Sequence, residues 1–99
     1  MTQVTLHTNG KTLTAKLSGE IDHHWATVLR RTIDDRVTAE TPKILILDFA
    51  AVTFMDSAGI GLILGRHKLV STLGGVVVVQ KAPAEIQKML ALAGIDAKE

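Results

Sequence analysis

The first part of the chain alternates between apolar and polar residues, as a strand with one buried face does. Residues 4–6 show this alternation, and residues 13–17 repeat it after the turn dipeptide Asn9-Gly10. A period of two on both sides of an Asn-Gly turn is typical of a β-hairpin. We therefore predict that the chain begins with two antiparallel strands.

After Ser18-Gly19 the spacing of apolar residues lengthens to that of a helix. The apolar positions are Trp25, Val28, Leu29, Ile33 and Val37. Asp22 precedes them, where an N-cap side chain accepts hydrogen bonds from the free N–H groups of a first helical turn. The pattern predicts a helix that Asp22 caps and that ends before Pro42.

Two short apolar runs follow, Ile44 to Leu47 and Val76 to Val79. Runs of this length favour strands that are covered on both faces. Between them, residues 58–72 predict a helix that stops at Gly74-Gly75, so the three segments form a βαβ unit with parallel strands. A last helix is predicted to begin at Pro83 and to end at Gly94.

Together these elements predict one α/β domain over residues 1–99. Its mixed sheet has four strands, antiparallel in the N-terminal hairpin and parallel afterwards, and three helices pack against it. In such folds, sites lie in the loops that follow the carboxyl ends of parallel strands. Here that loop is predicted over residues 50–57, directly before the central helix.

Composition excludes several classes of function. Hydrophobic residues make up 46% of the chain, with one Trp and two Phe, so the core is aliphatic and no stacking platform for nucleic acid is expected. The formal net charge is +1 and the charges are interspersed, which disfavours direct binding to nucleic acid or anionic lipid. Cys is absent, and no apolar stretch reaches the about 18 residues that a membrane span needs. Because residues 1–10 do not read as a signal peptide, we expect a cytoplasmic protein without membrane contact.

Ser57 stands at the junction between the predicted loop and the central helix. Its hydroxyl or the Asp56 carboxylate can cap the helix, which is the simplest role for either residue. A helix N-terminus also stabilises negative charge, so a phosphate on Ser57 would be accepted there without unfolding the chain. Both roles are open at this point.

Enzyme chemistry is not supported. Residues 55–59 lack the first glycine of a hydrolase nucleophile elbow, and His67 lies roughly 15 Å from Ser57 along the predicted helix. Gly59, Gly61 and Gly65 do not complete a nucleotide-binding fingerprint; we expect Gly61 and Gly65 to let the helix pack closely on the sheet. The adjacent His23 and His24 point apart on a helix and have no third ligand nearby, so no metal is expected.

Phe54 and Met55 are adjacent apolar residues in the predicted loop. Two such neighbours rarely both reach the core, so one should be exposed. Either Phe54 packs beneath the loop and Met55 has no particular role, or Met55 belongs to a protein-binding patch, since methionine adapts to partner surfaces.

Three segments carry a family resemblance: SGEIDHH at residues 18–24, ILDF at residues 46–49 and FMDSAGIGLILGR at residues 54–66. They closely resemble the SpoIIAA-type anti-sigma factor antagonists, which have the STAS fold. The resemblance is strong from Leu17 to about Gly75 and looser at both ends. Relatives of this type usually continue beyond the segment resembling residues 92–95 with a further strand and helix, whereas this chain ends at Glu99.

The resemblance implies a partner-switching mechanism. The unmodified antagonist would bind an anti-sigma factor that is also a serine kinase, and so release a sigma factor. That partner, which holds the ATP, would phosphorylate Ser57 and thereby end the binding, and a serine phosphatase would restore it. The expected partner contacts are Asp22, His23 and His24 in the first loop and Met55, Asp56, Ser57 and Gly59 in the second.

The same fold serves other roles. STAS domains also act as accessory or scaffold modules of transporters and signalling complexes, and fold alone does not decide between these functions. Asp56-Ser57 and the segment from Asp22 to His24 favour the phosphorylation switch.

Overall fold

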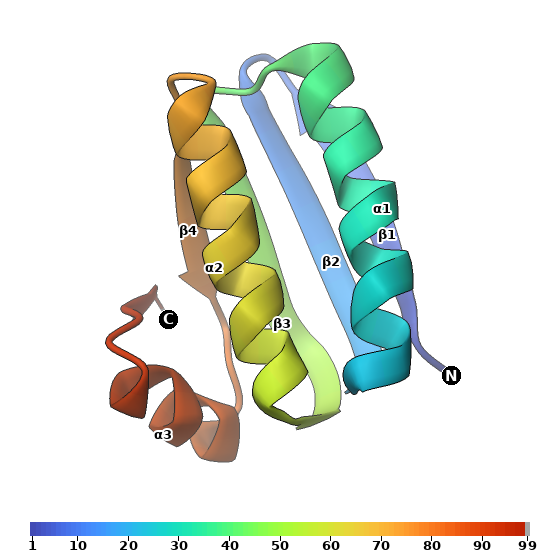
Figure 1. Cartoon of the computed structure of the whole chain (residues 1–99), viewed down its shortest axis with the longest axis vertical. Coiled ribbons are helices and arrows are strands. Elements are labelled where there is room, and N and C mark those ends of the chain that lie inside the picture. Colours follow the sequence, from blue (N-terminus) through green and yellow to red (C-terminus); the bar gives the residue numbers. More distant parts are fainter. Residues whose placement is uncertain (99) are drawn as a thin grey trace.

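The computed structural model describes residues 1–98. Its elements, in chain order, are β1 (Gln3–Asn9), β2 (Thr12–Ile21), α1 (His23–Glu40), β3 (Ile44–Met55), α2 (Ser57–Thr72), β4 (Val76–Gln80), α3 (Ala84–Leu92) and β5 (Ala97–Lys98). The strands form one sheet in the order β1-β2-β3-β4-β5. β1 and β2 are antiparallel, and every later pair is parallel. The predicted mixed α/β architecture with three helices is confirmed (Figure 1).

The sheet has one strand more than the sequence predicted. β5 comprises only Ala97 and Lys98, which pair with the end of β4 at Val79 and Gln80. A strand of two residues is too short to show a period of two, because one alternation cannot be told from chance. β5 forms because the chain comes back to β4 after α3, where its backbone pairs with that strand.

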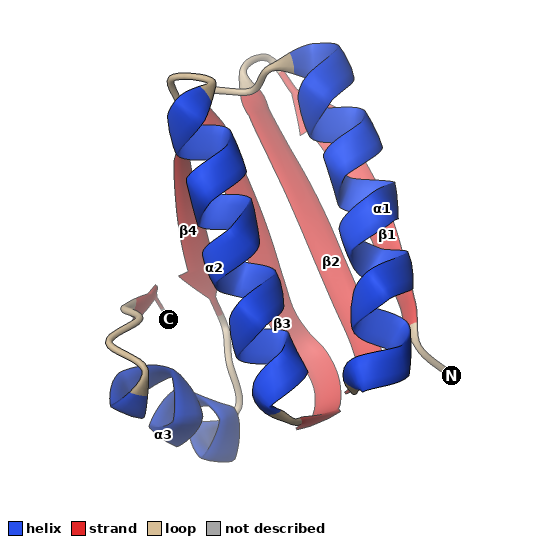
Figure 2. Cartoon of the chain, in the orientation of Figure 1, coloured by secondary structure: helices blue, strands red, loops and turns tan. Residues whose placement is uncertain are grey.

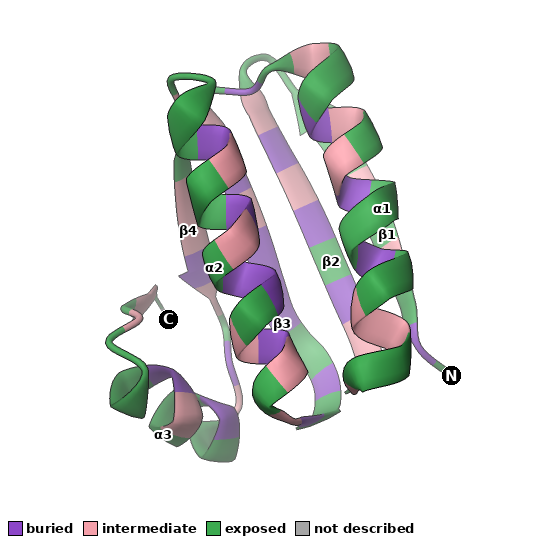
Figure 3. Ribbon diagram, viewed as in Figure 1, coloured by how far each residue is buried: buried purple, intermediate pink, exposed green. Residues whose placement is uncertain are grey.

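The helices α1 and α2 run side by side across one face of the sheet (Figures 1 and 2). Cross-strand register places Ala15, Leu47 and Val79 in one row beneath them. These residues are buried, as are Leu29, Ile33 and Val37 on the facing side of α1 (Figure 3). The main core therefore lies between these two helices and the sheet.

The opposite face of the sheet is less covered than the sequence suggested. The neighbouring row, Thr14, Ile46 and Val78, is only partly buried, and Val76 is exposed. The expectation that both apolar runs are covered on both faces is therefore wrong. α3 does not cover the face along its length; it lies near the end of β3, with Ile86 and Leu90 buried.

β3 is longer than predicted. The segment expected to be a loop over residues 50–57 is strand as far as Met55, because β2 pairs with it through Glu20 opposite Phe54 and Ile21 opposite Met55. This pairing has two register irregularities, between Lys16 and Ser18 and between Gly19 and Glu20, of the kind that increases the local twist of the strands. As a result only Asp56 separates the strand from α2.

Candidate functional site at two adjoining helix starts

Two aspartates begin the two helices that lie side by side. Asp22 Oδ1 accepts a hydrogen bond from the Trp25 backbone N–H at 2.9 Å, and Asp56 Oδ1 accepts one from Ala58 at 2.8 Å. The residues that precede them are paired across the sheet, and the Asp56 N–H donates to the Ile21 carbonyl at 3.2 Å. Parallel pairing of β2 and β3 therefore brings both helix N-termini to the same edge of the sheet.

Ser57 is the first residue of α2 and its side chain is exposed. The capping role that the sequence left open between two residues belongs to Asp56, whose carboxylate makes the cap hydrogen bond. Among residues 1–98, the structure records no hydrogen bond from the Ser57 hydroxyl. The hydroxyl is therefore free to be modified, and the partial positive charge of the helix N-terminus favours an added anion.

Phe54 and Met55 take opposite positions. The expectation that one of them is exposed is confirmed: Phe54 is 50% exposed, and Met55 is only 5% exposed. Both alternatives that the sequence left open are therefore wrong: Phe54 does not pack beneath a loop, and Met55 does not present an adaptable surface, because its side chain lies in the core. Phe54 contributes the apolar surface at this site, three residues before Ser57.

Phe54 lines an open groove of about 580 Å³ between the end of β3 and α3. The other lining residues are Val52, Thr53, Met55, Pro83, Glu85, Ile86 and Met89. Since most of these side chains are apolar, the groove adds a hydrophobic surface beside the exposed hydroxyl. Exposed apolar surface next to a polar group is a common feature of protein-binding sites.

The glycines of α2 divide into two groups. Gly59 is buried, and a Cβ atom there would overlap the Met55 side chain, so close packing requires glycine at this position. A Cβ at Gly61 or Gly65 would meet no atom within 4 Å. The prediction that Gly61 and Gly65 allow close packing on the sheet is therefore wrong; they border a pocket between α1 and α2.

His23 and His24 are both exposed in the first turn of α1. The His24 ring meets the Trp25 ring edge to face, with centroids 5.3 Å apart, while His23 borders the pocket between the two helices. Within residues 1–98, no three His, Asp or Glu side chains form a group that could hold a metal ion. The described part of the chain also has no helix long and apolar enough to cross a membrane.

Sequence reasoning missed two features of this region. The first is the exposure of Phe54, which depends on the irregular register between β2 and β3. The second is the buried Arg66, whose Nε lies 2.7 Å from Asp34 Oδ1 on α1. An arginine at the end of an apolar helical stretch was the available signal, but its partner is 32 positions earlier in the chain and has no local signature.

The chain is similar to known proteins over nearly its whole length. The STAS domain family matches residues 3–99. An anti-sigma F factor antagonist from Paenibacillus polymyxa is 31% identical over 93 residues, covering 94% of this chain and 80% of the relative. The unphosphorylated form of the anti-sigma factor antagonist SpoIIAA has a similar structure, with a TM-score of 0.84 and 26% identity over 94% of this chain and 82% of that one. The phosphorylated form of Bacillus SpoIIAA gives a TM-score of 0.77 at 26% identity, covering 94% of this chain and 85% of that one.

Proposed function

Because the chain belongs to the STAS domain family, we propose that it is an anti-sigma factor antagonist whose unmodified form binds an anti-sigma factor in the cytoplasm and so releases a sigma factor. Anti-sigma factor antagonists with this domain are regulatory binding proteins and not enzymes. The family relationship supports the general role. The finer steps rest on the site at the start of α2.

The exposed Ser57 carries the proposal. Its hydroxyl is at the first residue of a helix that another side chain already caps, so the fold does not depend on it. We infer that the anti-sigma factor is a serine kinase, that it phosphorylates Ser57 with its own ATP, and that a serine phosphatase reverses the step. The chain itself then needs no cofactor. The existence of a relative in a phosphorylated form supports this inference.

The proposed docking surface contains the helix starts around Ser57. Asp22, His23, Asp56 and the exposed Phe54 lie at the edge of the sheet where the two helices begin. Met55 and Gly59 contribute through the packing beneath this surface, because both are buried. His24 lies on the rim, where its ring packs against Trp25.

Phosphorylation would weaken binding of the partner without unfolding the chain. A phosphate adds about 1.5 to 2 negative charges next to the Asp56 carboxylate. The helix N-terminus tolerates this charge in water, but a docked partner would have to bury it. Such burial costs several kcal/mol, which weakens binding by a factor of about a thousand.

The test uses the anti-sigma factor kinase that is captured together with the unmodified chain and is then purified. With ATP, phosphopeptide mapping should place the label on Ser57. Ser57→Ala should bind constitutively and resist labelling, and Ser57→Asp should bind more weakly than the unmodified chain. Ser71→Ala is the matched control, since Ser71 is also an exposed serine of α2 but lies at its other end. Labelling of Ser71 or Thr53 in place of Ser57 would contradict the proposal.

A further inference from the structure

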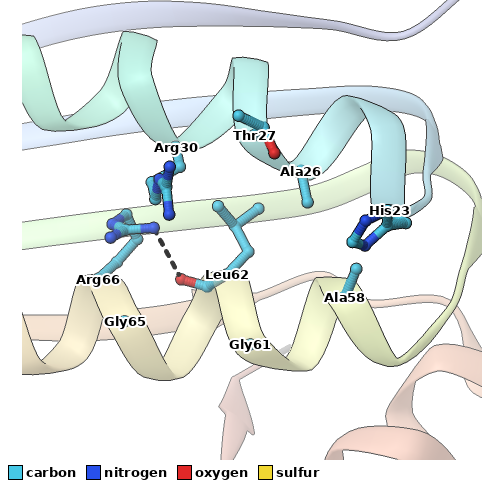
Figure 4. A pocket seen from close by; sticks show the side chains of 9 residues that line it. All are labelled: His23, Ala26, Thr27, Arg30, Ala58, Gly61, Leu62, Gly65 and Arg66. Atoms are coloured by element: carbon cyan, nitrogen blue, oxygen red, sulfur yellow. Dashed lines mark hydrogen bonds between the residues drawn. The ribbon is translucent and has the colours of Figure 1, made fainter.

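A pocket lies between α1 and α2 (Figure 4), and Ser57 is not among its lining residues. Its volume is about 230 Å³ and it opens to solvent. The side chains that give it chemical character are His23, Thr27, Arg30 and Arg66, and Gly61 and Gly65 form part of its wall on α2. Basic groups therefore reach this pocket from both helices.

Arg66 is the unusual member of this group, because it is a charged residue that is only 6% exposed. Its Nε forms an ion pair with Asp34 Oδ1 at 2.7 Å, and its Nη1 donates to the Leu62 carbonyl at 3.4 Å. Within residues 1–98, the structure records no hydrogen bond from Nη2. Nη2 is also not among the buried unpartnered atoms of residues 1–98, so it is accessible to solvent, and because Arg66 lines the pocket this nitrogen can donate to an acceptor there.

Arg30 brings a second guanidinium to the same place. Figure 4 shows the Arg30 side chain extending from α1 toward the Arg66 side chain on α2. Burial lowers the pKa of Arg66, and repulsion from Arg30 lowers it further, while Asp34 partly opposes both effects. Since a single carboxylate faces two guanidinium groups, the pocket retains a net positive charge.

The glycines keep this pocket open. Glycine inside a helix costs roughly 0.5–1 kcal/mol relative to alanine. Close packing does not explain that cost at Gly61 and Gly65, because an added Cβ would meet nothing within 4 Å at either position. A longer side chain at Gly65 would instead project into the pocket. The glycines therefore give a ligand access to Arg66.

We propose that this pocket binds a tetrahedral oxyanion, held by Arg30 and Arg66, which is either free phosphate or sulfate or the phosphate group of a small phosphomonoester. Paired guanidinium groups bind phosphate oxygens through charge-assisted hydrogen bonds. Pockets for drug-sized ligands start at about 300 Å³, so this smaller pocket fits a single anionic group and not a whole nucleotide. His23 lies at its rim, where it can contact the remainder of a monoester.

The test is an NMR titration of the full chain with inorganic phosphate at constant ionic strength. Signals of the Arg30 and Arg66 Nε–H groups and of the Gly61 and Gly65 amides should shift and saturate together. Arg30→Gln should weaken binding by about tenfold, because it removes a charge-assisted contact. Arg31→Gln is the matched control: it removes the same charge from the neighbouring exposed position, which does not line the pocket, and should leave binding unchanged.

Further titrations identify the source of the anion and separate this site from Ser57. Tighter binding of glycerol phosphate than of phosphate would indicate that the ligand is a phosphomonoester. Equal binding would indicate that the ligand is the free ion. Both results support the proposed pocket. Equal binding of acetate, shifts that do not saturate, or an unchanged affinity in Arg30→Gln would overturn it. Ser57→Ala should titrate like the unmodified chain. Shifts centred on the Ser57 amide, with the Gly65 amide and the Arg66 Nε–H group unchanged, would assign the anion to the helix N-terminus and also overturn the proposal.

Discussion

The Met55 side chain occupies the space that a Cβ atom on Gly59 would need. Met55 is the last residue of β3 and Gly59 lies in the first turn of α2, so the contact joins the strand to the helix across Asp56. Both residues are buried. This packing holds the start of α2 against the end of β3, and it therefore determines where the Ser57 hydroxyl lies.

We predict that Gly59→Ala destabilises the chain. The added methyl group must displace Met55, and overpacking of this kind costs about 1–3 kcal/mol, which exceeds the gain in helix propensity. Gly61→Ala is the matched control, because an added Cβ meets nothing within 4 Å and should stabilise the chain by about 0.5–1 kcal/mol. Urea unfolding of both variants measures the difference. Equal free energies of unfolding would show that Met55 moves aside without cost.

The division of roles between Asp56 and Ser57 predicts unequal effects on stability. Asp56→Ala removes the cap hydrogen bond to the Ala58 N–H and should lower the free energy of unfolding by about 1 kcal/mol. Ser57→Ala removes an exposed hydroxyl and should change it by less than about 0.5 kcal/mol. Thermal or urea denaturation of the two variants provides the comparison. A larger loss in Ser57→Ala would mean that the hydroxyl shares the capping role.

Glu40 should make the stability depend on pH. Hydrogen bonds from the Thr8 hydroxyl, at 2.7 Å, and from Arg36 lower the pKa of the Glu40 carboxyl below its usual value. The folded state thus favours the carboxylate, so this stabilisation is complete above the usual glutamate pKa and is lost as pH falls through the lowered value. The difference in unfolding free energy between the unmodified chain and Glu40→Gln should therefore shrink in acid. Glu20→Gln, at an exposed site, serves as the control; a Glu40→Gln difference that is the same at every pH would refute the prediction.

Phosphorylation at Ser57 should abolish partner binding while leaving the fold in place. The phosphate would lie at the positive end of α2, outside the core, so the melting temperature should change little. Calorimetry on the unmodified and phosphorylated chains, together with affinity measurements on the same samples, separates the two effects. A large fall in melting temperature that accompanies the loss of binding would show that the phosphate acts by unfolding the start of α2.

The order of the elements was predictable because it depends on local patterns. The period of two in the hairpin, the helical spacing after Asp22 and the glycines after Thr72 each act within a few residues. Because the signals for a helix start are also local, the position of Ser57 at the start of a helix was predictable as well. The two-residue β5 and the full length of β3 were not predictable, since both depend on pairing with strands elsewhere in the chain.

The sequence by itself therefore determined the mixed α/β fold, the helix starts and the position of Ser57. Only the tertiary structure decided that Asp56 provides the cap, that Phe54 is exposed while Met55 is buried, and that Gly59 packs closely while Gly61 and Gly65 do not. It also brought Arg66 to Asp34 and opened the pocket between the helices. The physical reason is that periodicity and capping are properties of neighbouring residues, whereas exposure, steric contact and ion pairing depend on atoms from segments that meet only in the folded chain.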